Sequence, residues 1–513
     1  MAPGRIDFLI EFREVSVRYP SADKPSLLHV SLTIPDGEIV HVRGPSGGGK
    51  STFCLCLNGI IPHLIHADIT GDVIINGMNV RDYEVSILSQ TVGLVFQNPE
   101  NQLFAMTVEE DVAFGPENLG LSRNHIIHRV EDALQVTGMT DCKYRQVFNL
   151  SGGQKQRTAI SGIYAMNPDI LVFDEPTADL DPKGTSEVLK TIYELNRRDG
   201  KTIILIEHKS EDVSLYCPPD RIITISEGKI ITDTPASDYF FTEKRFVSTK
   251  KKSSPDLFHG VSDNKIVVEA EGISYAYPDG TQALHDVSLQ VFKGEFVSII
   301  GENGCGKSTF LMHLNGLINP PNNAVKICGI PVSKKNAKKI TKVVGYLFQN
   351  PDNQICMNTV SREIAVGLTS SGISPLELSD IVSGALKTVD LDGYQDRDPN
   401  TLSRGERQRL AVASLIAIKP EVLLLDEPTT GQDYDRLCSL MECLSVLNRQ
   451  GTTILMVTHD ILLASSFSDR IIIMKKGRIA YEFSSPFPAH TALCTFACES
   501  DREENLNQPF LLK

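Results

Sequence analysis

Short runs of consecutive apolar residues, rich in β-branched side chains, recur along the chain and predict buried strands. They cover residues 170–173, 202–206, 422–425 and 453–457. A continuous apolar run is typical of a central parallel strand that is covered on both faces. Residues 186–193, which lie between two of these runs, have the apolar spacing of a helix. The alternation predicts an α/β fold built on a parallel sheet.

Five motifs occur twice in the chain, in the same order. Gly301 follows Gly44 by 257 residues and His459 follows His208 by 251, so the offset between the copies is nearly constant. A repeat this long is a tandem duplication of one domain and not a solenoid. The paired motifs are residues 44–52 and 301–309, 95–99 and 347–351, 150–154 and 402–406, 174–177 and 426–429, and the histidines 208 and 459.

The boundary between the two copies is predicted near residues 241–265. Lys250, Lys251 and Lys252 precede a Ser-Ser-Pro sequence, a composition that favours a solvated linker over a nucleic-acid or membrane patch. A strand then begins again at Ile266, much as one begins at Ile10. We therefore predict domains at residues 1–240 and 266–490, a linker at 241–265 and a C-terminal tail at 491–513. In that tail, Cys494 and Cys498 lie at helical spacing and are expected to pack onto the second domain.

Composition narrows the class of protein. The chain has 513 residues, a hydrophobic content of 41% and a net charge of −14, so it can bury a large core and lacks the basic excess of a protein that coats nucleic acid. We expect no nucleic-acid partner. Its 11 cysteines are scattered and fit neither a disulfide framework nor a zinc site. No apolar run approaches the roughly 20 residues of a membrane span, and no signal peptide is evident. We expect a cytoplasmic protein.

Both glycine-rich segments have the Gly-x-x-x-x-Gly-Lys-Ser pattern of a phosphate-binding loop. Each follows an apolar run, at 38–43 and 295–300, that predicts a strand. The glycines allow successive backbone N–H groups to face phosphate oxygens, and Lys50 and Lys307 are expected to bridge the β- and γ-phosphates. Cys305 is interpreted as a tolerated small residue. The predicted ATP-binding residues here are Gly44, Pro45, Ser46, Gly47, Gly48, Gly49, Lys50, Ser51, Thr52, Gly301, Glu302, Asn303, Gly304, Cys305, Gly306, Lys307, Ser308 and Thr309.

Acidic residues end two of the apolar runs, where the sheet edge meets the phosphate loops. Asp174 and Asp426 are expected to anchor Mg²⁺ together with the hydroxyls of Ser51 and Ser308. Glu175 and Glu427 follow directly, and strand alternation is expected to turn their side chains elsewhere, towards an attacking water, as general bases. His208 and His459 end the next apolar runs and are expected to sense the γ-phosphate.

The segment Leu150 to Gln154, Leu-Ser-Gly-Gly-Gln, completes a set of motifs that resembles the nucleotide-binding domains of ABC-type ATPases. The resemblance covers nearly all of both copies. It implies a P-loop fold in each, with a RecA-like parallel sheet, an antiparallel β subdomain and a helical signature subdomain. It also implies that the protein binds ATP and Mg²⁺ and hydrolyses the ATP. The two domains of the one chain are expected to sandwich two ATP molecules head to tail. Tyr19 and Tyr277 match the aromatic residue that stacks on adenine.

In that family the signature segment reaches ATP held by the other domain's phosphate loop. A helix N-terminus, with its free N–H groups and positive dipole end, suits this role. The second copy departs from the pattern, because Arg404 replaces a glycine and Glu406 replaces glutamine. We expect two hydrolytic sites of unequal rate. The residues predicted to act in trans are Ser151, Gly152, Gly153, Gln154, Ser403, Arg404, Gly405 and Glu406.

Gln97 and Gln349 match the glutamine that in this family touches Mg²⁺ and moves the surface that grips a partner. Both begin a Gln-Asn-Pro-acid-Asn-Gln run, at 97–102 and 349–354, which resembles the ATPases of energy-coupling-factor importers of vitamins, cobalt or nickel. Asn-Pro is expected to halt any helix and to form a rigid turn. The resemblance implies a transmembrane coupling subunit and a membrane substrate-binding subunit on separate chains, and a peripheral location on the cytoplasmic face of the membrane.

Three alternatives remain open. A ribosome-associated tandem ABC ATPase typically has a longer charged helical linker and a basic surface. A sugar-importer ATPase usually has a degraded second phosphate loop, whereas residues 301–308 are intact here. An exporter also remains possible, because nothing in an ATPase sequence defines the direction of transport. The transported substrate is not encoded in this chain.

Overall fold

The computed structural model describes residues 9–20, 22, 24–45, 47–178, 180–238, 265–321, 324–368, 374–428, 434–487 and 493. The chain divides into two compact units, which are described in turn. Apart from Lys265, the predicted linker lies outside the described residues. So does most of the predicted tail, Cys494 and Cys498 included, although Leu493 is buried against the second domain. The predicted domain boundaries therefore stay predictions.

A six-stranded sheet forms the centre of the first domain, with the order β10-β9-β3-β8-β7-β6. Neighbouring strands from β9 to β6 are parallel, and β10 adds to the edge in the antiparallel sense. The apolar runs at 170–173 and 202–206 are interior strands, as predicted, and their side chains enter the cores on both faces of the sheet. The strands are β3 (Ile39–Arg43), β6 (Val92–Val95), β7 (Ile170–Asp174), β8 (Thr202–Ile206), β9 (Arg221–Ser226) and β10 (Lys229–Pro235).

A four-stranded antiparallel sheet with the order β2-β1-β4-β5 packs against one face of the central sheet. Helix α1 (Lys50–Leu57) is buried between the two sheets, and Phe53 on α1 stacks on Phe12 with ring centroids 4.7 Å apart. This sandwich holds the start of α1 rigidly beside the end of β3. The strands are β1 (Ile10–Arg18), β2 (Leu27–Ile34), β4 (Asp68–Ile75) and β5 (Met78–Asn79), and the short helices are α2 (Ile60–His63) and α3 (Val85–Leu88).

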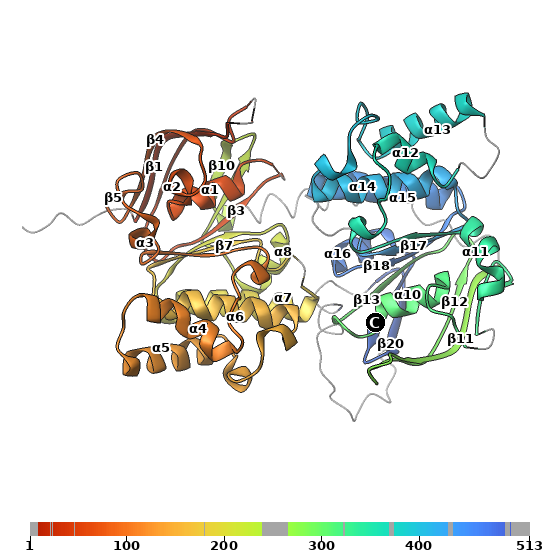
Figure 1. The fold of residues 1–513 in the computed structure, drawn as a ribbon, viewed down its shortest axis with the longest axis horizontal. Coiled ribbons are helices and arrows are strands. Elements are labelled where there is room, and N and C mark those ends of the chain that lie inside the picture. Colours follow the sequence, from red (N-terminus) through yellow and green to blue (C-terminus); the bar gives the residue numbers. More distant parts are fainter. Residues whose placement is uncertain are drawn as a thin grey trace, which may run out of the picture. The chain divides into compact units, whose positions relative to one another are not determined.

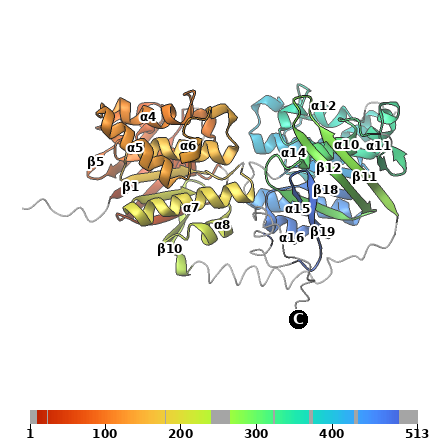
Figure 2. The same ribbon diagram turned by 90° about the horizontal axis from the view of Figure 1, so that it is seen from below.

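Helices cover the other face of the central sheet (Figure 1). Helix α7 (Pro182–Asp199) buries Val188, Leu189 and Ile192 in the same apolar cluster as the sheet residues Leu171 and Phe173. Three helices pack on one another as a separate group, visible in orange and yellow in Figure 2. They are α4 (Val108–Asn118), α5 (Arg123–Val136) and α6 (Gly152–Ala165), and α8 (Ser210–Tyr216) follows β8.

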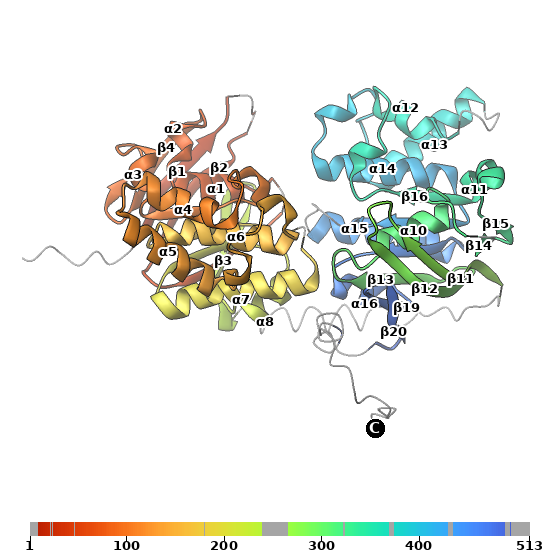
Figure 3. The same ribbon diagram turned by 60° about the horizontal axis from the view of Figure 1, so that its bottom comes forward.

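The second domain repeats this architecture (Figure 3). Its sheets have the orders β16-β17-β18-β13-β19-β20 and β12-β11-β14-β15. The strands are β11 (Ile266–Ala276), β12 (Gln282–Phe292), β13 (Phe296–Gly301), β14 (Val325–Ile327), β15 (Ile330–Pro331), β16 (Val344–Leu347), β17 (Val422–Asp426), β18 (Thr453–Val457), β19 (Arg470–Lys475) and β20 (Arg478–Ser484). The helices are α10 (Lys307–Asn315), α11 (Ala337–Val343), α12 (Val360–Ala365), α13 (Pro375–Thr388), α14 (Arg404–Ile418), α15 (Tyr434–Arg449) and α16 (Ile461–Phe467).

The strand order positions the candidate site in each domain. In the first domain β3 pairs with β8, and β8 pairs with β7, all parallel. In the second, β13 pairs with β18, and β18 with β17, in the same way. Carboxyl ends of parallel strands meet at one edge of a sheet, so the segments that follow these strands converge there. Within the described ranges, no helix has both the length and the apolar character that crossing a membrane requires.

Candidate active sites

The glycine loops approach neighbouring backbone so closely that a side chain would not fit. Gly49 caps the N-terminus of α1 with a φ of 107°, and Gly306 caps α10 with a φ of 101°. A Cβ atom at Gly49 would lie 2.3 Å from the carbonyl oxygen of Ser26, and one at Gly306 would lie 2.4 Å from that of Ala283. Both glycines are therefore required for loop closure. Of the predicted loop residues, Ser46 lies outside the described part of the chain.

Each loop lysine lies inside its own loop. Lys50 Nζ donates to the carbonyl oxygens of Gly44 at 2.9 Å and Pro45 at 3.0 Å. Lys307 Nζ donates to those of Gly301 at 2.8 Å and Glu302 at 2.9 Å. Both lysines are 5% exposed. A buried ammonium surrounded by carbonyl oxygens and amides provides positive charge at the helix N-terminus, where a phosphate group binds.

A serine and an aspartate meet beside each loop. Ser308 Oγ donates to Asp426 Oδ1 at 3.0 Å. Burial and the adjacent Glu175 raise the pKa of Asp174 to about 6, although a hydrogen bond from Ser51 opposes the shift. Burial likewise raises the pKa of Asp426. Hydroxyl and carboxylate oxygens are the donors that Mg²⁺ prefers, and it usually takes few protein ligands beside substrate phosphates, so the pair fits that ion. Among the described residues no cluster of three His, Cys, Asp or Glu side chains forms a metal site.

The glutamate after each aspartate is paired with the predicted histidine. His208 Nε2 donates to Glu175 Oε1 at 2.9 Å, and His459 Nε2 lies 2.6 Å from Glu427 Oε1. Burial acts to raise the pKa of Glu175, but the hydrogen bond and charge of His208, with Lys50, outweigh it and lower that pKa. The same balance, with His459 and Lys307, lowers the pKa of Glu427. Each site thus holds an ionised carboxylate.

Strand alternation does not orient these glutamates, which corrects the expectation from the sequence. β7 ends at Asp174 and β17 at Asp426. The next residues, Glu175 and Glu427, have φ values of 49° and 51°, in the left-handed region. A non-glycine residue in this region is unusual and often lies at a functional site. The backbone turn, and not the pleat, directs each carboxylate towards its histidine.

The two tyrosines expected to stack on adenine lie near the loop helices. Tyr19 Oη is 3.2 Å from Thr52 Oγ1, and Tyr277 Oη is 3.0 Å from Thr309 Oγ1. Each hydroxyl therefore ties its ring to the first turn of α1 or α10. Stacking on adenine stays a prediction.

The signature segments begin long helices in the same way. Ser151 caps α6 by accepting from Gln154 N at 3.3 Å, and the Gln154 side chain accepts from Ser151 N at 3.1 Å. Ser403 and Glu406 make the same reciprocal pair at the start of α14, at 3.3 Å and 2.8 Å. A capping box accepts Glu or Gln at this position, so Glu406 preserves the local structure. Arg404 is the first residue of α14, and its side chain lies outside the described part.

The turn after each predicted glutamine is a short 3₁₀ helix, Pro99–Asn101 or Pro351–Asn353. Asn98 and Asn350 cap these turns by accepting from the backbone N–H two residues on. Gln97 is exposed, and Gln349 Nε2 donates to Glu427 Oε2 at 2.8 Å. The expected turn at Asn-Pro is therefore present in both domains, and its rigidity stays a prediction. Contact of either glutamine with Mg²⁺ stays a prediction.

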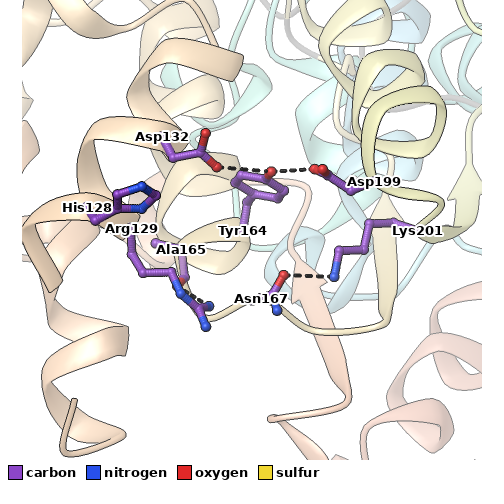
Figure 4. Close-up of a pocket in the computed structure, with 8 residues that line it drawn as sticks. All are labelled: His128, Arg129, Asp132, Tyr164, Ala165, Asn167, Asp199 and Lys201. Carbon is purple, nitrogen blue, oxygen red and sulfur yellow. Dashed lines mark hydrogen bonds between the residues drawn. The ribbon is translucent and has the colours of Figure 1, made fainter. Parts of the chain in front are cut away.

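A hollow of about 320 Å³ in the first domain lies apart from these residues (Figure 4). Its polar side chains bond mainly to one another. The hydroxyl of Tyr164 bonds to Asp199, and Lys201 Nζ donates to Asn167 Oδ1 at 2.9 Å. No phosphate-loop residue lines it, so it is not the nucleotide site.

Three residues that lie beside the predicted His208 or Asp426 were not predicted from the sequence. Glu207 and Lys209 flank His208, and Tyr346 Oη donates to Asp426 Oδ2 at 3.2 Å. Thr458, Asp460 and Leu94 occupy the matching positions in the other copy. Their differences between the copies are the only signal the sequence contains.

Comparisons with known proteins agree with this geometry. The family model described as ABC transporter matches residues 27–178 and 284–430. A protein of Methanosarcina mazei, named as an ABC transporter ATP-binding protein, is 38% identical over 527 residues, which cover 93% of this chain and 89% of the relative. A similarly named protein of Caldanaerobacter subterraneus is 36% identical over 516 residues, which cover 91% and 90%.

Two solved structures each match 43% of the chain. The ATP-binding cassette MJ0796, a dimer bound to ADP and Pi, is 32% identical, with all of that chain covered and a TM-score of 0.41. The protein cbiO1 from Clostridium perfringens, described as part of the ABC transporter complex cbiONQ, is 32% identical, with 88% covered and a TM-score of 0.40.

The fold and the paired sites define a P-loop ATPase with two nucleotide-binding domains. The chain belongs to the ABC transporter family, as the ATP-binding subunit. Both of its α/β domains are ABC ATPase domains, which bind and hydrolyse ATP.

Proposed function

We propose that this chain is the ATPase of an energy-coupling-factor importer for a vitamin or a transition-metal ion. The observation that carries the proposal is the Gln-Asn-Pro-acid-Asn-Gln run in both copies, folded into the same capped turn. In the first domain the last glutamine, Gln102, closes the turn, because its side chain accepts from Phe96 N and donates to Leu94 O, both at 2.9 Å. A turn with this much internal bonding presents a defined surface to a partner.

The acidic residue of each turn is paired with a basic residue of the signature helix. Glu100 Oε1 lies 2.5 Å from Lys155 Nζ, and Asp352 Oδ1 lies 2.8 Å from Arg407 Nε. The pairs occupy matching positions in the two copies. They are partly exposed, so each contributes little to stability. In the proposal, these ion pairs link movement of the turns at Pro99–Asn101 and Pro351–Asn353, which bind the partner, to the signature helices α6 and α14.

An exposed apolar cluster on the first domain supports a protein partner. Phe104 and Phe114 meet edge to face with centroids 4.3 Å apart and are 62% and 46% exposed. Met106 and Phe148 are 67% and 66% exposed, and the backbones of Met106 and Val147 are hydrogen bonded. Exposed apolar patches mark interaction sites. We assign this apolar cluster (Phe104, Met106, Phe114 and Phe148) to the transmembrane coupling subunit, a separate chain that also binds a membrane substrate-binding subunit.

The matching positions of the second domain are more polar. Cys356, Asn358, Val366 and Asn400 stand where the first domain has Phe104, Met106, Phe114 and Phe148. The coupling subunit therefore meets two chemically different faces in this proposal. The ATPase is placed at the cytoplasmic face of the membrane, as a peripheral subunit.

In each site the same groups are assigned the same tasks. Lys50 and Lys307 bind the β- and γ-phosphates together with the loop amides. Glu175 and Glu427, which their lowered pKa keeps ionised, accept a proton from the attacking water, and His208 and His459 hold those carboxylates in position. Ser51 with Asp174, and Ser308 with Asp426, are the proposed Mg²⁺ ligands, joined by Gln97 and Gln349. Bound Mg²⁺ neutralises charge on the phosphate oxygens.

The signature residues complete each site in trans in this proposal. Ser151 would contact the ATP held by Lys307, and Ser403 the ATP held by Lys50, so that ATP binding closes the two domains and hydrolysis reopens them. Because ATP binds the closed state better than the open state, the difference in affinity drives movement of the membrane partner.

A pull-down of the tagged chain from detergent-solubilised membranes of its own cells, followed by mass spectrometry, tests the proposal. We expect to recover a multi-span coupling subunit and a small membrane substrate-binding protein, whose identity would also narrow the substrate. Recovery of ribosomal proteins without a membrane subunit would overturn the transport assignment and leave the ATPase intact.

A further inference from the structure

A buried carboxylate lies directly beside the catalytic histidine of the first domain. Glu207 follows β8 and is 2% exposed. Its Oε2 accepts from the hydroxyl of Thr177 at 2.5 Å and from Thr177 N at 3.3 Å. Its Oε1 accepts from the backbone N–H groups of His208 at 2.8 Å and Lys209 at 3.4 Å. A buried charge is tolerated only when it is well hydrogen bonded, and here both oxygens are occupied by donors.

Lys209 also contacts Thr177, through the carbonyl oxygen of its backbone. Its Nζ donates to the carbonyl oxygen of Thr177 at 2.8 Å, and it lies within 3.4 Å of Leu180 O and Thr185 Oγ1. Glu207 and Lys209 thus bind both polar groups of the Thr177 backbone as well as its hydroxyl. Thr177 lies two residues after Glu175, and the next residue, Ala178, donates from its backbone N to Glu175 O at 3.2 Å.

The histidine lies between these two residues in sequence and bonds to the same catalytic region. His208 Nε2 donates to Glu175 Oε1 at 2.9 Å. Three consecutive side chains, at 207, 208 and 209, therefore connect the end of β8 to Glu175 and to the segment that follows it. Displacing this backbone would move the histidine and the general base relative to each other.

The second domain lacks these side chains. Thr458 replaces Glu207, and its Oγ1 accepts from Asp460 N at 3.1 Å. Asp460 replaces Lys209, and its Oδ1 caps α16 by accepting from Leu463 N at 2.9 Å. Thr458 is shorter than Glu207 and uncharged, and Asp460 has the opposite charge to Lys209, so neither can make the contacts that Glu207 and Lys209 make with Thr177. Thr429, which matches Thr177, lies outside the described part of the chain. We call the contacts of Glu207 and Lys209 with Thr177 the tether.

We propose that Glu207 and Lys209 are positioning residues of the first ATP site, which hold His208 and Thr177 in one arrangement around Glu175. The inference rests on the proposed catalytic roles of Glu175 and His208. Because neither side chain touches the phosphate loop in the contacts above, loss of the tether slows hydrolysis without weakening ATP binding. The proposal also predicts two sites of unequal rate, independently of any effect of Arg404.

Glu207→Gln tests the tether with little change of shape. Both carboxylate oxygens of Glu207 accept hydrogen bonds from N–H or O–H groups. In Glu207→Gln one of these oxygens becomes an NH₂ group, which would face another donor, so hydrogen bonding at that end is lost. The turnover lost in Glu175→Gln measures the share contributed by the first site. We expect Glu207→Gln to remove about nine-tenths of that share, with KM for ATP and the melting temperature close to wild type. Adding Glu207→Gln to Glu175→Gln should change the remaining turnover by less than twofold.

A second variant, Thr177→Val, removes the hydroxyl that Glu207 binds. If the two residues act as one unit, the double variant Glu207→Gln/Thr177→Val has a turnover within twofold of Glu207→Gln alone. Glu194→Gln, an exposed carboxylate of α7, is the matched control and should leave turnover unchanged.

Three results would decide against the tether: unchanged turnover in Glu207→Gln, strictly multiplicative effects of the two substitutions, or a rise in KM that accompanies a large loss of melting temperature. Wild-type turnover in Glu175→Gln would instead remove the proposed general base. That result would overturn both the general base and the tether, whereas unchanged turnover in Glu207→Gln alone would overturn the tether only.

Discussion

The hydroxyl of Tyr346 donates a hydrogen bond to the carboxylate of Asp426 at 3.2 Å, and the residue that matches Tyr346 in the first domain is Leu94. β6 pairs with β7 in the same register as β16 with β17, so the two positions are structurally equivalent. With Ser308 on its other oxygen, Asp426 has both carboxylate oxygens engaged. The two ATP sites therefore differ next to a proposed metal ligand.

Tyr346→Phe should lower the free energy of unfolding by about 1–2 kcal/mol, because a hydrogen bond to a buried carboxylate is among the stronger ones. Urea unfolding followed by far-UV circular dichroism measures this loss. Tyr144→Phe, at a tyrosine that is 75% exposed, is the control and should have no effect. Equal stability of Tyr346→Phe and wild type would show that this bond contributes nothing in solution.

Replacing both proposed general bases tests the assignment of the catalytic residues. Glu175→Gln/Glu427→Gln removes the carboxylates that accept the proton and keeps their size, so turnover should fall by about a hundredfold or more while ATP still binds. Turnover is measured by phosphate release, and retained nucleotide by gel filtration with labelled ATP. Normal turnover in the double variant would contradict the assignment.

The single variants report on the two sites separately. Glu175→Gln and Glu427→Gln should each retain part of the wild-type turnover, in unequal amounts, because the tether and Tyr346 differ between the copies. If one variant kept all of the turnover and the other kept none, catalysis at two sites would be wrong.

Polar substitution in the apolar cluster should weaken binding of the membrane partner. Phe104→Asn/Phe114→Asn exchanges two exposed aromatic side chains for polar ones, and we expect at least a tenfold loss of the co-purified coupling subunit. ATP turnover of the isolated chain should stay within twofold of wild type, because neither side chain contacts the loops described above. Val366→Asn, at the position in the second domain that matches Phe114, is the control. The same loss in this control, or none in either variant, would contradict the assigned docking site.

The buried His313 should make the second domain sensitive to acid. Its side chain is fully buried, its Nδ1 bonds to the carbonyl oxygen of Thr309 at 2.7 Å, and its ring packs edge-on against Tyr275. Burial lowers the pKa of His313 below its ordinary value of 6.5, despite the opposing bond to Thr309. The unfolded chain therefore binds a proton more readily than the folded one, and stability falls as the pH drops below about 6.5.

His313→Leu should remove this part of the acid sensitivity. The expected result is a melting temperature that declines less between pH 7 and pH 5 than that of wild type. An identical decline in the two proteins would show that the histidine is not the titrating group.

Many elements that position the sites could be predicted from local pattern. The apolar runs at 170–173 and 422–425 are interior strands of the two central sheets, and the glycine loops join strand to helix as expected. These features depend on interactions between near neighbours in sequence, which composition and spacing record directly. Glu406 shows the limit of motif comparison, because it looks like a departure from the pattern yet makes the same helix cap as Gln154.

The sequence alone determined the duplication, the α/β class and the residues that line each phosphate loop, because a strand, a glycine turn and a helix start are local structures. Only the tertiary structure decided which groups meet across the sheet. His208 reaches Glu175 over 33 residues, and Tyr346 reaches Asp426 over 80. The left-handed turn at Glu175 and the burial of Glu207 also depend on packing from distant strands. Such contacts arise from the order of strands in the sheet, and no local spacing of residues encodes that order.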